Sequence, residues 1–178
     1  METVAAACAV CLVVVFAAAA VGKLRGAGSF PAFVRTLKDL GVIPERWARG
    51  CALLLVAGEI SVAVLLLTAP LAPGLGTAGF ILAAGLLAAF TAGIAITAAR
   101  RTGVRCRCFG ASASPLGARH AARNAALALI AVTGAALAPA IARVQPAEAL
   151  LAVCAGTLAG ALAIVWDDIV GLFRPVSH

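Results

Sequence analysis

The sequence has few charged residues. Of its 178 residues only 12% are charged, whereas 63% are hydrophobic and the mean hydropathy is +1.09. A soluble domain of this length needs far more polar surface to stay in solution. The composition therefore excludes a soluble globular protein and favours one that lies in a membrane.

Aromatic residues are scarce as well, at 5% of the chain. This scarcity bears on whether the net charge of +7 indicates nucleic-acid binding. Proteins that bind nucleic acids combine basic patches with exposed aromatic side chains on which bases stack. Here the basic residues alternate with apolar spans instead. The sequence gives no reason to expect a nucleic-acid partner.

The hydrophobic residues gather in five blocks. Each block has about the 20 residues that a helix needs to cross the hydrocarbon core of a bilayer, and only Glu59 places a formal charge inside any of them. The blocks are Val4–Val21, Cys51–Leu67, Leu75–Ala99, Ala125–Ala142 and Ala149–Trp166. Their abundant alanine and glycine allow helices to approach closely.

These blocks predict an all-α fold, a polytopic helical bundle that forms one integral-membrane domain over residues 1–178. The expected transmembrane helices cover about 4–24, 46–69, 75–99, 115–142 and 147–170. We expect the first to be retained as a transmembrane helix. Ala17–Ala20 resembles a signal-peptide cleavage site, but the preceding Met1-Glu2-Thr3 lacks the positive charge that a signal peptide carries.

The basic residues are segregated between the spans. Twelve of the fourteen lie in the connections between the first and second spans and between the third and fourth: Lys23, Arg25, Arg35, Lys38, Arg46, Arg49, Arg100, Arg101, Arg105, Arg107, Arg119 and Arg123. Cytoplasmic loops of membrane proteins carry such an excess of lysine and arginine. The pattern predicts a multi-pass protein of the cell membrane with both connections in the cytoplasm and the N-terminus outside.

The first basic connection contains a short amphipathic segment. Phe30–Leu40 alternates apolar and basic residues with the spacing of a helix that lies in the membrane interface. Ser29 is placed to cap this helix, and Trp47 sits where an interfacial anchor would. In the second connection, Ser114-Pro115 resembles a cap followed by proline at the first helical position, which predicts that the fourth span starts there.

Two cysteines lie one residue apart in the second basic connection, as Cys106-Arg107-Cys108. Arg105 and Arg107 favour the thiolate form by charge attraction, and the nearby helix start acts in the same direction. A thiolate is the reactive form in disulfide exchange, and a disulfide across one residue is strained and therefore exchangeable. The pair is the candidate redox element of the chain.

Two other interpretations of this pair stay open. A soft metal would need two more ligands; His120 is the only nearby candidate, and the flanking arginines repel a cation. The pair can also be inert. The remaining cysteines, Cys8, Cys11, Cys51 and Cys154, lie in or at the ends of spans, where cysteine usually behaves as a small hydrophobe. Cys51 opens the second span on the same membrane face as the pair and is a candidate third thiol.

Glu59 lies ten residues past Arg49, hence about 15 Å into the membrane. An ionised carboxylate at that depth is costly and should be paired or protonated, so we expect it to face the bundle interior. Lys23, at the same-side end of the first span, is the best partner if its stem reaches inward, and Asn124 is a candidate hydrogen-bond partner. Such a group can be a proton site, a quinone contact or a structural clasp between helices.

Four elements together resemble a known family: Gly22-Lys23-Leu24, Glu59, Cys106-x-Cys108-Phe109-Gly110 and Arg123-Asn124. In this order, over about residues 5–137, they resemble the MauE branch of the MauE/DoxX-like membrane proteins. The resemblance implies a four-helix core, to which this chain adds a fifth C-terminal transmembrane helix. It also implies thiol redox chemistry, and for the namesake a part in methylamine utilisation, helping to form the disulfides of the small subunit of methylamine dehydrogenase.

The layout is also similar to that of vitamin K epoxide reductase-like proteins, which carry a cysteine pair at the start of a bundle helix and use a quinone.

The predicted membrane side of the cysteine pair departs from a role in disulfide formation. Disulfides form outside the cytoplasm, whereas the charge pattern places the Cys106 connection inside, where thiol pools would keep the pair reduced. The sequence thus leaves three hypotheses: a thiol–disulfide redox protein with a thioredoxin-like partner and a quinone as candidate cofactor, a non-catalytic assembly scaffold, and a small proton-coupled transporter using Glu59.

Overall fold

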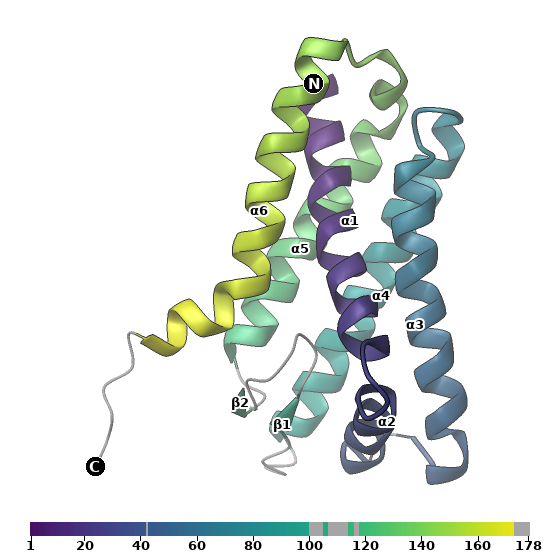
Figure 1. Cartoon of the computed structure of the whole chain (residues 1–178), viewed down its shortest axis with the longest axis vertical. Helices are drawn as coiled ribbons and strands as arrows, with labels where there is room; N and C mark the ends of the chain where they lie inside the picture. The colour runs from purple at the N-terminus through teal and green to yellow at the C-terminus, as the bar shows by residue number, and fades with distance from the viewer. Residues whose placement is uncertain (42, 100–104, 107–113, 116–117, 173–178) are drawn as a thin grey trace.

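A computed structural model describes residues 1–41, 43–99, 105–106, 114–115 and 118–172 of the chain. Its long elements are helices that run side by side (Figure 1). In chain order they are α1 (Glu2–Leu24), α2 (Ser29–Asp39), α3 (Glu45–Leu67), α4 (Pro73–Ala99), β1 (Arg105–Cys106), β2 (Ser114–Pro115), α5 (Ala118–Leu137), the 3-10 helix η1 (Ala138–Arg143) and α6 (Pro146–Leu172).

Within the described residues, five helical segments are long and apolar enough to cross a membrane. They are Glu2–Leu24, Glu45–Leu67, Gly74–Ile96, His120–Ile141 and Pro146–Trp166. The predicted all-α membrane bundle is confirmed, and the chain is a multi-pass integral membrane protein. Large apolar side chains such as Leu54, Leu129 and Leu150 are more than half exposed on the outside of the bundle, as expected for a surface that faces lipid.

Helix α1 lies among the other helices, with α6 on one side and α3 on the other (Figure 1). The main hydrophobic core is built around it from Leu12, Val15 and Phe16, together with Phe80 of α4 and Leu127 of α5. Helix α2 of the first basic connection and the strands β1 and β2 of the second lie at one end of the bundle, and the N-terminus and η1 are at the other (Figure 1). The described parts of both connections therefore share one end of the bundle, as the sequence predicts.

Helix α2 packs at that end of the bundle through its apolar face. Phe33 and Leu37 are buried against Ala52 and Val56 of α3, in a cluster separate from the main core. The predicted amphipathic helix is thus present. The predicted cap is wrong, because Gly28 is the N-cap residue and the hydroxyl of Ser29, already inside the helix, donates to the carbonyl of Arg25 at 2.7 Å.

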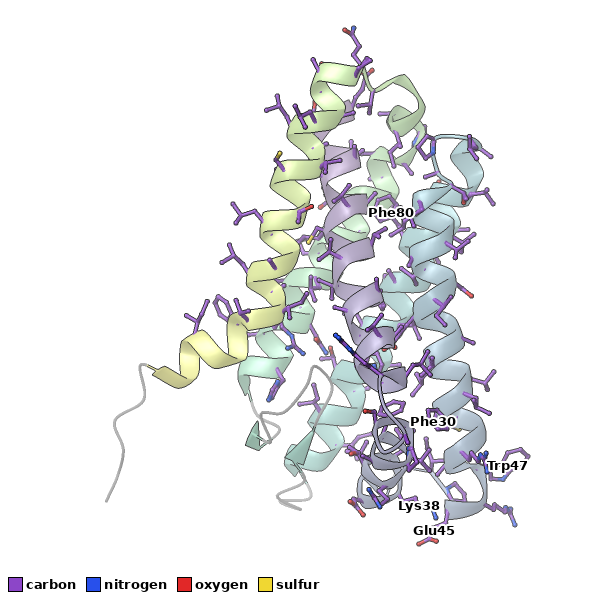
Figure 2. All side chains as sticks on the ribbon, viewed as in Figure 1. Phe30, Lys38, Glu45, Trp47 and Phe80 are labelled. Carbon is purple, nitrogen blue, oxygen red and sulfur yellow. The ribbon has the colours of Figure 1, made fainter. Side chains whose placement is uncertain are left out.

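The exposed side of this end carries polar and interfacial residues. Figure 2 shows Phe30, Lys38, Glu45 and Trp47 here, whereas Phe80 lies farther along the bundle. Trp47 is 60% exposed, as an anchor in the headgroup region should be.

The predicted start of the fourth span is wrong. Ser114-Pro115 is the short strand β2, which pairs antiparallel with β1, and α5 begins only at Ala118. In the ladder Arg105 is opposite Pro115 and Cys106 is opposite Ser114. The physical reason is that a residue before proline favours extended backbone over the helical conformation, and β1 supplies a partner for that extended pair.

Glycines allow α6 to approach α1 closely. A Cβ atom added to Gly156 would lie 2.6 Å from the carbonyl oxygen of Ala7 and 2.7 Å from Cβ of Val10. One added to Gly160 would lie 2.9 Å from Cβ of Val14. Their four-residue spacing is the small-xxx-small pattern by which membrane helices pack backbone against backbone.

We predict that Gly156→Ala loosens this contact and lowers the free energy of unfolding by about 1–3 kcal/mol, the usual cost of forcing a methyl group into filled space. Gly85→Ala on α4 is the control, because no atom lies within 4 Å of the added Cβ atom there. Unfolding in detergent titrations, followed by circular dichroism, measures both variants. Equal stability of the two would contradict the close α1–α6 packing.

Candidate functional site

A buried ion pair joins α1 to α3. Nζ of Lys23 lies 2.5 Å from Oε1 of Glu59 and donates a hydrogen bond to it, although 36 residues separate them in the chain. The two side chains are only 3% and 1% exposed. The structure therefore places Glu59 inside the bundle with Lys23 as its partner, as its depth in the membrane predicts.

Lys23 also touches two other helices. Its Nζ is 5.0 Å from the ring centroid of Phe33 on α2 and 5.9 Å from that of Phe90 on α4. At such distances the electron-rich face of an aromatic ring attracts an ammonium group. Nζ also lies 3.4 Å from the carbonyl oxygen of Ala19, which accepts a weak hydrogen bond. Four helices thus meet at one ammonium group.

Glu59 uses only one of its two carboxylate oxygens in this contact. The other, Oε2, is buried and has no hydrogen-bond partner among the residues that the structure describes. Leaving a buried acceptor unsatisfied costs about 1–3 kcal/mol, and more for a charged group. The site can therefore accept one more hydrogen bond, or a proton, on the side of the carboxylate away from Lys23.

Three buried polar residues lie on the first turns of α5, which packs on α1 and α4. His120 is 7%, Arg123 8% and Asn124 6% exposed. Their spacing of three and four residues puts them on one face of the helix. Arg123 and Asn124 were singled out from the sequence, and both are buried here. The ion-pair partner that the structure gives Glu59 is Lys23.

The two aromatic neighbours of Lys23 were missed in the sequence. Phe33 belongs to the segment Phe30–Leu40 that the sequence assigns to an interfacial amphipathic helix, and Phe90 lies inside the apolar block Leu75–Ala99. A weak signal existed, because Phe90 stands near the end of α4 that leads into the basic connection. An aromatic ring can pack against almost any side chain, so this position alone does not identify a lysine as its partner.

The cysteine pair is only partly described. Arg105 and Cys106 form β1, whose backbone pairs with Pro115 and Ser114. The side chains of these two residues, together with the whole of Arg107 and Cys108, lie outside the described residues. The redox role of the pair therefore stays a prediction.

The other cysteines are described. Cys8 and Cys51 are half-buried, Cys11 is buried, and Cys154 is exposed on the surface of the bundle. Cys51 lies eight residues before Glu59 on α3, which corresponds to about 12 Å along the helix. Within the described residues, no group of three or more His, Cys, Asp or Glu side chains could hold a metal ion.

We predict that Lys23→Met lowers the free energy of unfolding by about 3–5 kcal/mol, because it leaves an uncompensated carboxylate buried in the bundle. Lys38→Met is the matched control. Lys38 also pairs with a glutamate, at 3.7 Å from Glu45, but these side chains are 40% and 81% exposed. Such surface pairs contribute less than about 1 kcal/mol. Reversible unfolding in mixed micelles compares the two variants, and a similar small loss in both would contradict the buried pair.

Comparison with known proteins identifies the relatives of this chain. The family model of the methylamine utilisation protein MauE matches residues 1–137. The methylamine utilization protein MauE of Paracoccus denitrificans is 40% identical over 99 residues, which make up 55% of this chain and 50% of that protein. The chain thus matches about half the length of this curated relative. No solved structure matches the chain. Because the family match extends from α1 to the end of α5, the chain belongs to the MauE family.

Proposed function

We propose that this chain is a membrane accessory protein of methylamine utilisation and that its working group is the Cys106/Cys108 thiol pair. One observation carries the proposal. The match to the methylamine utilisation family covers residues 1–137 and so includes the basic segment with both cysteines. The name of the Paracoccus denitrificans relative supports the same pathway. The thiol chemistry rests on the cysteines and their flanking arginines.

The position of the segment supports this role. Cys106 belongs to the ladder that precedes α5, at the end of the bundle where α2 also lies (Figure 1). Its backbone is held by pairing with Ser114. This is the end of the bundle at which a soluble partner protein would meet the pair.

The proposed reaction is thiol–disulfide exchange with a thioredoxin-like partner. One cysteine thiolate attacks a sulfur of the partner disulfide and forms a mixed disulfide, and the first partner sulfur leaves as a thiolate. The second cysteine thiolate attacks the mixed disulfide, which closes the Cys106–Cys108 disulfide and releases the second partner sulfur. This chain loses two electrons and its partner gains them, and the released thiolates take up protons from water.

The membrane side of the segment determines the direction of electron flow. In the cytoplasm, reducing thiol pools favour transfer of electrons from this chain to its partner. Outside, in an oxidising compartment, the reverse reaction makes the chain an oxidant for folding proteins. The basic residues of the segment favour the cytoplasmic side. A quinone in the bilayer stays a candidate carrier for these electrons.

We predict that Cys106 and Cys108 change redox state together in intact cells. Oxidant treatment should protect both thiols from alkylation, and reductant should expose both. Comparing a membrane-permeant with an impermeant alkylating reagent also reports their side. Cys106→Ala and Cys108→Ala should each abolish function, and one of them should accumulate a mixed disulfide with the partner.

A variant with Cys8, Cys11 and Cys154 all replaced by alanine is the control for this experiment. These residues lie within α1 and α6, so their loss should leave activity nearly intact. A pair that never changes redox state, or full activity in either single variant, would leave a non-catalytic assembly scaffold as the better account. Loss of activity in the Glu59→Gln variant alone would instead favour a proton-coupled transporter.

A further inference from the structure

We propose that the Lys23–Glu59 pair is a proton-exchange site within the membrane and that α2 is the cover that separates this site from the membrane surface. The proton binds at Oε2 of Glu59. This oxygen belongs to a side chain that is 1% exposed, and it has no hydrogen-bond partner among the described residues. The inference does not rest on the cysteine chemistry, because it uses none of the thiols.

A purely structural ion pair explains this arrangement poorly. Burying an ion pair in apolar surroundings adds little net stability, and apolar residues of similar volume often serve as well. When such a pair does stabilise a protein, further hydrogen bonds satisfy its remaining lone pairs. Here Oε2 lacks such a bond within the described part of the chain. A group that takes up and releases a proton needs a free lone pair, and Oε2 provides one.

The two aromatic rings support the protonated state. When Oε2 takes a proton from water, Glu59 becomes neutral and Lys23 keeps its positive charge, so the site gains one unit of charge. Phe33 and Phe90 then still face the ammonium group, at 5.0 and 5.9 Å. A desolvated ammonium group is stabilised by ring faces whatever the charge of its carboxylate neighbour. Release of the proton to water restores the ion pair.

The other charges of α3, on Glu45, Arg46 and Arg49, are exposed on its first two turns. Helix α4 contains no Asp, Glu, Lys, Arg or His between Pro73 and Ala99. The basic residues of α2, Arg35 and Lys38, are exposed on its outer side. On α5, which packs on α1, His120 and Arg123 are buried. The guanidinium group of Arg123 is permanently charged and disfavours a further positive charge in the same bundle interior, which favours release of the proton.

The ends and the packing of α2 suit it to cover the Lys23–Glu59 site. It is connected to the bundle through Gly26, with φ +102°, and Gly41, with φ +61°, at its two ends. Only glycine adopts these backbone angles readily. Between them α2 packs through Phe33 and Leu37 in a small cluster with α3 that is separate from the main core. The helix can therefore move as a unit about two glycine turns, and its Phe33 ring lies directly against the ammonium group it covers.

Infrared difference spectroscopy of the full chain in phosphatidylcholine nanodiscs tests the proposal. Exposed carboxylates are ionised above about pH 6. A protonated carboxylic acid band that changes as the pH is varied above this value therefore comes from a buried group. We expect such a band in the wild type and its loss in Glu59→Gln. Labelling all glutamates with carbon-13 should shift the band, which assigns it in the wild type without reliance on the variant.

The cover is tested by the rate at which this band shifts after transfer to D2O. Phe33→Leu keeps apolar bulk but removes the ring. In this variant the proton on Glu59 should exchange for deuterium about tenfold faster than in the wild type, because the cation–π contact to a desolvated ammonium group is lost. Phe30→Leu makes the same change on the same helix and should exchange close to the wild-type rate. Absence of a glutamate band overturns the proton site. Equal exchange in the two leucine variants overturns the cover.

Discussion

The arrangement of this membrane protein depends on one contact, the ion pair between Lys23 and Glu59. Inside a bilayer, charged side chains have no water to hydrate them, so each must find a partner within the protein. Their contact, with Nζ 2.5 Å from Oε1, fixes the end of α1 against the middle of α3. The rings of Phe33 and Phe90 on the same ammonium group then tie α2 and α4 to that point.

Helix α1 can serve this contact because its opposite side is held just as closely. There the backbone of α6 lies against α1 at Gly156 and Gly160, where no side chain intervenes. Small residues on one side and a charged pair on the other place α1 inside the bundle, although it is as apolar as a helix that faces lipid. Helix α2 and the strands β1 and β2 lie at the same end of the bundle (Figure 1).

The sequence was sufficient to predict the spans and the Lys23–Glu59 pair, because a bilayer leaves few alternatives for an apolar block or a buried charge. It was insufficient for Ser114 and Pro115, whose extended conformation depends on pairing with a strand eight or more residues earlier. It also missed Phe33 and Phe90 as neighbours of Lys23, since an aromatic side chain has many suitable environments. The cap expected at Ser29 failed because Gly28 occupies that position and the serine hydroxyl bonds back to Arg25 instead.

The central claim is that Lys23 and Glu59 act as one unit, and a double-mutant cycle tests it most directly. The free energies of unfolding of Lys23→Met, Glu59→Leu and the double variant are measured under the same conditions. The account predicts a coupling free energy of at least about 2 kcal/mol, with the double variant more stable than either single one, because removing both charges leaves neither of them buried alone. Strictly additive losses would contradict the account.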